Sequence, residues 1–350
     1  MPEITVNGKK IIAQEDATVL QTATEAGIYI PSLCFHPRVG KSGNCRVCVV
    51  EVDGMRDLQL SCMLEVKEGM VIHTESERVK AARKVVVGLL LANGDFDLSH
   101  PEENEFARVV KHCGLKKSPY PALEREYTYD DSHPILVYDE SKCIRCFRCV
   151  RACNNNVVNE VLAMAYRGID SKVVADADLP WRSSSCVACG ECIQICPTGA
   201  LTAKQYLKKP RQKNVEKIET VCPYCGVGCK IVLHVNKKRN CIVRVTGAED
   251  AVTNEGMLCI KGRFGYDFVS SQERLTTPLI KDSNGTFQKV SWEKAFSIIA
   301  EKLTATKKQY GSDSIAGLAS AKVTNEENYV FQKFMRKEIG TNNVDHCARL

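Results

Sequence analysis

The spacing of the cysteines constrains this chain more than any other feature of its sequence. Nineteen of the 350 residues are cysteines, and most of them stand in C-x2-C runs. Clustering of this kind favours metal binding over the disulfide framework of a small secreted domain. Sixteen of the nineteen can be grouped into four sets of four. Four thiolates are what one iron–sulfur cluster or one structural zinc ion requires.

Two of the sets repeat the pattern C-x2-C-x2-C-x3-C about 43 residues apart. This is the pattern of bacterial two-cluster ferredoxins, in which the fourth cysteine of each run ligates the cluster of the other run. It predicts two [4Fe–4S] clusters with crossed ligands, so cluster loss should unfold the whole module. One cluster would be held by Cys143, Cys146, Cys149 and Cys196, and the other by Cys186, Cys189, Cys192 and Cys153.

The first set along the chain has longer spacings and consists of Cys34, Cys45, Cys48 and Cys62. The glycines around it suit a loop whose backbone N–H groups face an anionic cluster. A zinc site is the alternative, since four cysteines also suit zinc. The set resembles the long-spaced [2Fe–2S] domain of complex I large subunits, hydrogenases and NAD-linked formate dehydrogenases, and this resemblance implies one [2Fe–2S] cluster.

The fourth set is Cys222, Cys225, Cys229 and the more distant Cys259, a pattern that predicts a single [4Fe–4S] site. The strings Cys-Pro-Tyr-Cys-Gly-Val-Gly-Cys and Gly-Met-Leu-Cys-Ile-Lys-Gly-Arg-Phe-Gly resemble the N-terminal cluster domain of molybdopterin formate dehydrogenases. In that family the lysine two residues after the last ligand lies between cluster and pterin, which implies a role in electron relay for Lys261. The alternative for Lys261 is an ordinary surface lysine.

A fifth cluster of the same family is not expected here. Family members often carry one held by the pattern H-x3-C-x2-C-x5-C. Counted from His100, that pattern falls on Asn104, Ala107 and Cys113. Asn and Ala do not offer the thiolate that iron requires. We therefore interpret His100 and Cys113 as relics of a cluster site.

The last residues, Val-Asp-His-Cys-Ala-Arg-Leu, resemble the segment that leads into the metal ligand of formate dehydrogenases. That ligand, a cysteine or selenocysteine, is expected just after Leu350, so no catalytic ligand is expected within the chain. Cys347 would be a packing residue beside the metal, and Cys241, in an apolar run, a buried small hydrophobe. Our hypothesis is that the chain is the front of a selenoprotein whose UGA codon reads as a stop. The alternative is a genuine short protein or a nonsense truncation.

The chain is expected to be an α+β multidomain protein. A β-grasp [2Fe–2S] ferredoxin domain (1–78) precedes a helical linker with the degenerate histidine/cysteine site (79–135). A two-cluster [4Fe–4S] ferredoxin domain (136–207) and a small β-rich [4Fe–4S] domain (215–271) follow. An incomplete α/β molybdopterin domain (272–350) comes last, and so short a piece cannot bury its sheet.

Local patterns predict the elements of these domains. Asn7-Gly8 indicates a hairpin turn, and Thr18 with Gln21 is a capping box at the start of a helix. Alternating and β-branched runs predict strands, and 3.6-residue periodicity predicts helices. The expected strands are 4–6, 10–13, 46–52, 58–62, 231–235, 241–245 and 314–318, and the expected helices are 77–92, 101–112, 292–308 and 325–338.

Charge and composition exclude other classes of function. The formal charge is +6 with neutral thiols. Because a four-thiolate cluster carries roughly −2, four clusters would bring the holoprotein to about −2, so basicity is no argument for nucleic acid. The longest apolar run is far too short for a membrane span, and no secretory signal is visible. Thiols in this number suit a reducing cytoplasm.

The resemblance implies the iron–sulfur part of a formate dehydrogenase catalytic subunit. Formate would lose two electrons and a proton at a Mo- or W-bis(pterin guanine dinucleotide) centre of the full-length enzyme, giving CO2. The electrons would pass Lys261 and the Cys222 cluster, cross the two cubanes and reach the Cys34 cluster. A flavin-bearing NAD-reducing subunit or a ferredoxin would accept them. Alternatives are a non-enzymatic four-cluster carrier, a complex I large subunit-like protein and an iron-only hydrogenase, although the Cys222 motif stands where the hydrogenase cysteines would be.

Overall fold

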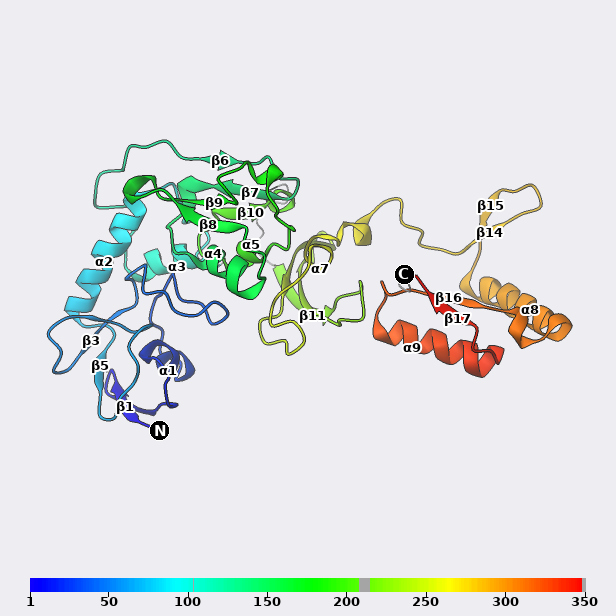
Figure 1. Cartoon of the computed structure of the whole chain (residues 1–350), viewed down its shortest axis with the longest axis horizontal. Helices are drawn as coiled ribbons and strands as arrows, with labels where there is room; N and C mark the ends of the chain where they lie inside the picture. Colours follow the sequence, from blue (N-terminus) through cyan, green and yellow to red (C-terminus); the bar gives the residue numbers. More distant parts are fainter. Residues whose placement is uncertain (103, 208–214, 348–350) are drawn as a thin grey trace. The chain divides into compact units, whose positions relative to one another are not determined.

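The structure is a computed structural model that describes all residues except 103, 208–214 and 348–350. It divides into two compact units, Met1–Arg211 and Gln212–Leu350, which are described separately (Figure 1). Within the described residues, no helix is both long enough and apolar enough to cross a membrane.

The N-terminal module is a five-stranded sheet with one helix packed on it, which is the expected β-grasp arrangement. The Asn7-Gly8 turn joins the first two strands with positive φ at both residues (50° and 82°), and Thr18 closes the predicted capping box with Gln21. The strand order is β2-β1-β5-β3-β4, with β1 and β5 parallel. The elements are β1 Glu3–Val6, β2 Lys9–Ile12, α1 Val19–Glu25, β3 Val49–Val52, β4 Gln59–Leu60 and β5 Val71–His73.

Two helices form the segment that follows, α2 (Glu77–Ala92) and α3 (Glu105–His112). The prediction of a helix from residue 101 was wrong at its start, because the Asn104 side chain caps α3 and residues 101 and 102 form a turn. Figure 1 shows α2 running from the N-terminal module toward the next module. The apolar faces of α2 and α3 share one buried core with residues of both neighbours. This core contains Leu33, Val47, Val87, Phe106, Val109, Val110 and Ile144.

The two-cluster module is built around two short helices in matched positions of the sequence repeat. A left-handed residue precedes each helix, Phe147 (φ 64°) before α4 and Gly190 (φ 73°) before α5. α4 (Arg148–Arg151) continues as a π-helical turn, Ala152–Asn156. A three-stranded antiparallel sheet in the order β10-β7-β6 and a hairpin of β8 and β9 complete the module. The remaining bounds are β6 Tyr129–Asp130, β7 Leu136–Asp139, β8 Leu162–Ala165, β9 Lys172–Ala175, α5 Glu191–Ile195, β10 Leu201–Ala203 and α6 Lys204–Leu207.

The second unit begins with a three-stranded antiparallel sheet, β11 (Val215–Val221), β12 (Lys230–Asn236) and β13 (Cys241–Gly247), followed by the short helix α7 (Ile260–Phe264). The strands expected over 231–235 and 241–245 are confirmed. Burial of Cys241 was predicted wrongly. This residue is only half-buried, because it opens β13 directly after an exposed turn instead of standing at mid-strand.

The last segment has the expected mixture of helices and strands, but it buries little apolar surface. Its two-stranded parallel sheet pairs β16 with β17. The 19-residue helix α8 contains no buried residue, and its Trp292 and Phe296 side chains are 59% and 60% exposed. The exposed faces agree with the expectation of a partial α/β domain. Its elements are β14 Leu279–Lys281, β15 Phe287–Lys289, α8 Trp292–Tyr310, β16 Gly317–Ala319, α9 Asn325–Phe334, a π-helical turn Met335–Ile339, and β17 Val344–His346.

A buried arginine of α2 ties the helix to the N-terminal module. The Arg83 guanidinium, 2% exposed, donates to the carbonyl oxygens of Val47 (3.2 Å) and Val49 (3.1 Å) and pairs with Glu75 (3.0 Å). Arg83→Ala would leave these buried acceptors without a donor, so we expect the free energy of unfolding to fall by about 2–4 kcal/mol. Chemical denaturation followed by circular dichroism measures this loss.

The matched control is Arg78→Ala on the same helix. The Arg78 side chain is 49% exposed and lies 3.6 Å from Glu51. Since an exposed ion pair contributes little, its loss should cost less than about 1 kcal/mol. Equal losses for the two variants would contradict the assignment of Arg83 as the tie between helix and module.

Candidate iron–sulfur centres

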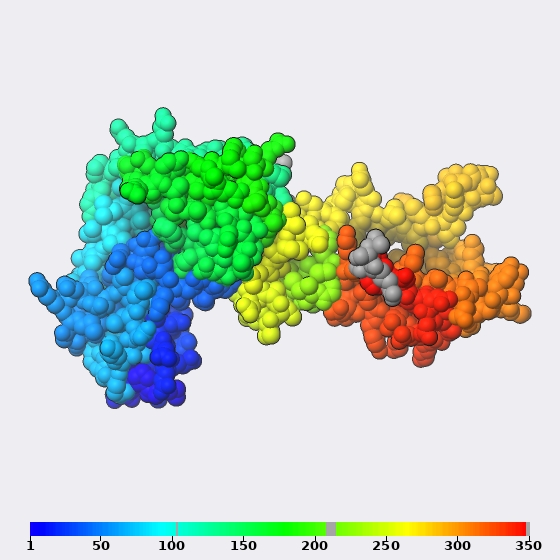
Figure 2. Space-filling model, viewed as in Figure 1, coloured from blue at the N-terminus to red at the C-terminus, as the bar shows by residue number. Residues whose placement is uncertain are grey.

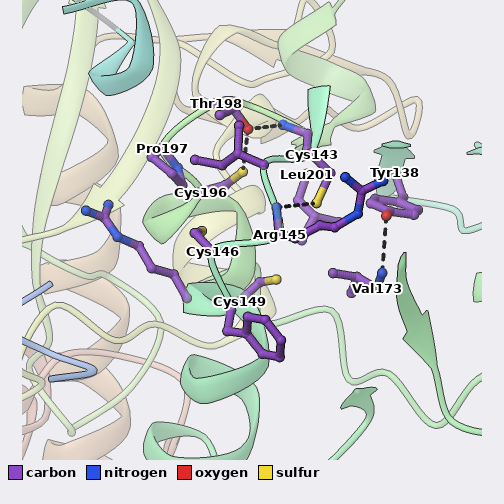
Figure 3. Close-up of a pocket in the computed structure, with 14 residues that line it drawn as sticks. Tyr138, Cys143, Arg145, Cys146, Cys149, Val173, Cys196, Pro197, Thr198 and Leu201 are labelled. Atoms are coloured by element: carbon purple, nitrogen blue, oxygen red, sulfur yellow. Dashed lines mark hydrogen bonds between the residues drawn. The ribbon is translucent and has the colours of Figure 1, made fainter. Parts of the chain in front are cut away.

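The four thiols predicted to hold the first cubane surround one cavity in the two-cluster module (Figure 3). Cys143, Cys146 and Cys149 come from the turn and first part of α4, and Cys196 comes from the distant segment after α5. The Arg145 backbone N–H donates to the Cys143 sulfur at 3.4 Å. The Cys196 sulfur lies 3.5 Å from the Thr198 hydroxyl oxygen. The fold therefore brings together the crossed set that the spacing predicted.

A second cavity in the same module repeats this arrangement. It is lined by Cys186, Cys189 and Cys192 from the second run and by Cys153 from the first. The Ala188 backbone N–H donates to the Cys186 sulfur at 3.4 Å, exactly matching the contact of Arg145 with Cys143 in the first cavity. The sequence repeat is thus also a repeat of backbone geometry.

The chemistry of these cavities fits clusters bound by thiolate. Burial raises the pKa of the Cys146 thiol to about 12 and raises the pKa of Cys149 well above its ordinary value. Thiols in such surroundings keep their protons unless cations replace them, so iron binding would release protons. In the described part of the chain, the buried Arg148 Nε lacks a hydrogen-bond partner. A donor left in this way beside a sulfur-lined cavity fits an anionic acceptor.

The first set also converges, in the N-terminal module. All four of its cysteines are buried, with Cys62 0% and Cys34 1% exposed. Thiol–thiol hydrogen bonds with Cys45 and Cys62 lower the pKa of Cys34, and those with Cys34 and Cys48 raise the pKa of Cys62. The contacts connect all four sulfurs, and four adjacent buried thiols are a suitable donor set for a [2Fe–2S] cluster.

The fourth set lies at one end of the β11–β13 sheet. Cys222 follows β11 and Cys229 precedes β12, and the Cys222 N–H donates to the Cys229 carbonyl oxygen at 2.8 Å. Helix α7 approaches so closely that a Cβ at Gly262 would stand 3.3 Å from the Cys222 sulfur. Glycine permits this approach. Cys259, at the start of α7, is exposed.

The Lys261 side chain is exposed on α7. Burial raises the pKa of the Cys222 thiol, and the charge of Lys261 acts in the opposite direction on the same thiol. Lys261 therefore interacts electrostatically with the Cys222 thiol.

Residues of the degenerate site near His100 cap the two ends of helix α3. The Asn104 Oδ1 accepts from the Ala107 N–H at 3.0 Å, and its Nδ2 donates to the Thr198 carbonyl oxygen at 3.3 Å. Ala107 and Cys113 are buried, 2% and 6% exposed, and Cys113 is the C-cap residue of α3. The His100 imidazole lies 3.4 Å from the carboxylate of Glu102. Asn104 and Cys113 thus cap the two ends of α3.

Arginines of α4 bind the N-terminal module to the two-cluster module. Arg148 donates to the Phe35 carbonyl oxygen at 2.6 Å, and Arg151 donates to the carbonyl oxygens of Val39 (2.8 Å) and Cys34. The two modules form one continuous surface in the space-filling view, blue against green (Figure 2). Sequence analysis missed these arginines, and also Gly262. The available signal was their position within or directly beside the cysteine motifs.

Four family models match consecutive parts of the chain. They are a 2Fe-2S iron-sulfur cluster binding domain (residues 2–77), a 4Fe-4S dicluster domain (142–201), a molybdopterin oxidoreductase Fe4S4 domain (215–271) and molybdopterin oxidoreductase itself (274–350). The last two matches adjoin each other in the order that the sequence motifs predicted. The chain belongs to the molybdopterin oxidoreductases.

Curated members of this family align with nearly the whole chain. The Bacillus subtilis protein named "Probable oxidoreductase YjgC" is 37% identical over 99% of the chain. The NADPH-Fe(3+) oxidoreductase subunit alpha of Geobacter sulfurreducens is 35% identical over 100%, and a Staphylococcus aureus protein named "Putative formate dehydrogenase SAV2309" is 31% identical over 99%. The chain spans about two fifths of the length of these molybdopterin oxidoreductases, 39–40%.

A solved structure resembles part of this molybdopterin oxidoreductase. It is a chain from the crystal structure of an NAD+-reducing [NiFe]-hydrogenase in the H2-reduced state, and it is 32% identical. The TM-score is 0.54, and the match covers 58% of this chain and 87% of the other. The chain therefore has the iron–sulfur modules of the N-terminal part of a formate dehydrogenase-like alpha subunit.

The helix cap at Asn104 gives a prediction for stability. Asn104→Ala removes the side-chain acceptor of the Ala107 N–H, so the free energy of unfolding should fall by about 1 kcal/mol. Asn104→Ser keeps a capping oxygen and should lose much less. Both variants should retain the wild-type iron content. Iron loss in Asn104→Ser would show instead that this region takes part in cluster binding.

Crossed ligation gives a prediction for iron content. Cys196→Ala should remove one [4Fe–4S] cluster that the first run otherwise ligates, and it should lower the thermal stability of the two-cluster module. Iron and sulfide analysis with EPR spectroscopy counts the clusters. Cys241→Ala, a half-buried cysteine outside all four sets, is the matched control and should retain every cluster. A full complement of iron in Cys196→Ala would refute the crossed set.

Proposed function

We propose that this chain is the iron–sulfur portion of a formate dehydrogenase catalytic subunit that oxidises formate to CO2. The observation that carries the proposal is the Cys222 set with Gly262 packed on it, in a segment that matches the molybdopterin oxidoreductase Fe4S4 domain directly before the catalytic domain. The name of the Staphylococcus aureus relative supports formate as the substrate.

The cofactors proposed are one [2Fe–2S] cluster, three [4Fe–4S] clusters and, in the full-length enzyme, a Mo- or W-bis(pterin guanine dinucleotide). When bound, the clusters supply one-electron redox chemistry between the pterin site and an acceptor. This chain's residues would supply the thiolates and exclude water from the clusters. The buried thiols of the Cys34 set and of Cys143, Cys146, Cys149 and Cys192 contribute to this exclusion, and the Gly262 approach does so at the fourth set.

Five domains divide this work in the proposal, 1–78, 79–135, 136–207, 215–271 and 272–350. The helices of the second domain act as a brace. The α3 backbone donates from the Phe106 N–H to the Pro197 carbonyl oxygen at 3.1 Å, next to Cys196. Glu105 pairs with Arg148 at 2.8 Å. Helix α3 of the degenerate site thereby contacts two residues that line the cavity of the Cys143 set.

The acceptor proposed is a flavin-bearing, NAD-reducing subunit or a ferredoxin in the cytoplasm, docked on the module of the Cys34 set. The NAD+-reducing hydrogenase and the NADPH-Fe(3+) oxidoreductase subunit among the similar proteins support a nicotinamide-linked partner. The catalytic metal ligand is proposed to follow Leu350. Strand β17, which pairs in parallel with β16, would lead toward it.

A four-cluster electron carrier is the second candidate. The observation in its favour is that all four cysteine sets are complete within a chain that spans two fifths of its relatives. Sequencing the DNA beyond the Leu350 codon separates the two. An in-frame TGA followed by a histidine codon and several hundred further codons supports the enzyme. TAA, TAG or the absence of downstream coding sequence supports the carrier.

Lys261 gives the test of electron passage in the full-length enzyme. Lys261→Ala should retain all iron, because lysine is not a ligand. It should slow formate-driven reduction of the clusters by roughly tenfold, which equals about 1.4 kcal/mol of barrier. Stopped-flow spectroscopy under anaerobic conditions measures the rate.

Two controls accompany this experiment. Lys237→Ala removes a lysine of the same unit whose side chain is 71% exposed, and it should leave the rate unchanged. Reduction by dithionite should be equally complete in all variants. An unchanged formate-driven rate in Lys261→Ala would remove the relay role. Failure of the wild-type holoenzyme to reduce its clusters with formate would reject formate as the substrate.

A further inference from the structure

The two halves of the two-cluster module carry opposite charges at one matched position. With the cysteines of the repeat aligned, Arg148 stands where the second run has Glu191. Both residues precede the third cysteine of their run, and both are almost fully buried, 2% and 1% exposed. Buried charges at equivalent positions of a repeat require a specific explanation, since charged side chains are rarely buried. The other differences in charge between the two runs are Arg145 for Ala188 and Arg151 for Gln194.

The same contrast appears in the walls of the two cavities. The cavity of Cys143 is lined by Arg145 and Arg148, and no acidic side chain lines it. The cavity of Cys186 is lined by Glu191, and no basic side chain lines it. These statements cover the described residues, which include both cysteine runs in full.

Each of the two buried charges has a partner of opposite sign outside its cavity wall. Arg148 pairs with Glu105 at 2.8 Å, and Glu191 pairs with Arg38. Neither Glu105 nor Arg38 lines either cavity, so the lining residue is the charge of each pair that borders the cluster space. In the described part of the chain, the Arg148 Nε has no hydrogen-bond partner, and the same holds for Nε and Nη1 of Arg38, the partner of Glu191.

We propose that this asymmetry sets the order of the two reduction potentials. The cluster of Cys143, Cys146, Cys149 and Cys196 has the higher potential, and that of Cys186, Cys189, Cys192 and Cys153 the lower. One-electron reduction adds one negative charge to a cluster. A buried guanidinium stabilises that charge and a buried carboxylate opposes it, and net charge and hydrogen bonds to sulfur are known determinants of cluster potential.

The site of higher potential adjoins the N-terminal module. Cys146 belongs to the same buried core as Cys34 and Cys45, and Arg151, two residues after Cys149, donates to the Cys34 carbonyl oxygen. The lining charges therefore favour an electron on the cubane beside the [2Fe–2S] set. This inference rests on the proposed function only in requiring that both cubanes assemble.

The experiment is an EPR-monitored redox titration of the anaerobically purified holoprotein. Iron and sulfide analysis first establishes whether the clusters are present, and their absence would count against the proposed function. With the clusters present, Arg148→Gln should lower the higher of the two module potentials, and Glu191→Gln should raise the lower one. The gap between them should narrow in both variants.

Arg148→Lys tests charge separately from packing. Lysine keeps the positive charge but lacks the guanidinium that contacts Phe35 and Ile195. The potential of the Cys143 cluster in this variant should therefore stay near the wild-type value. Arg167→Gln, an exposed arginine of the same module, should shift neither potential. The proposal is overturned if Arg148→Gln shifts the lower potential, if Arg148→Lys lowers the higher potential as much as Arg148→Gln, or if neither neutral variant changes the gap. Should Arg148→Gln lose its cluster, the Glu191→Gln titration still decides.

Discussion

The crossed supply of thiols between two distant segments is the constraint on which the first unit depends. Each cavity of the two-cluster module takes three cysteines from one run and a fourth from the other. Neither run can form its site alone, so the two turns must fold against each other. Contacts between the modules of this unit are made by residues of the two cysteine runs or by residues next to them. Arg148 and Arg151 bind the loop of Cys34, and α3 contacts the segment of Cys196 through Pro197.

Hydrogen bonds and burial position helix α3, whose two ends are capped at positions of the histidine/cysteine motif. Asn104 caps the first turn, Ala107 and Cys113 are buried, and Glu105 reaches the buried Arg148. The Phe106 N–H also donates to Pro197 beside Cys196. These contacts keep the helix beside the two-cluster module.

Sequence analysis succeeded where the physical signal is local and failed where it depends on tertiary context. Cysteine spacing predicted which thiols line the two cavities of the two-cluster module, and cap chemistry predicted the start of α1. The exposure of Cys241 and the late start of α3 were predicted wrongly, because each is decided by what lies next to the segment in space. Arg148 and Glu191 occupy equivalent positions of the repeat and carry opposite charges. Only the burial of both side chains in the folded protein shows that this difference matters. Ligation itself and the role of Lys261 remain predictions.

The crossed arrangement has a consequence for synthesis of the protein on the ribosome. Cys34 and its loop are translated early, but the arginines that bind this loop belong to a module whose first cavity lacks a wall until Cys196 has been translated. The N-terminal module can form its own sheet before then, while its docking has to wait for both cysteine runs. Iron delivery to the cubanes would therefore follow translation of both cysteine runs, and iron shortage would leave the N-terminal module undocked from the two-cluster module.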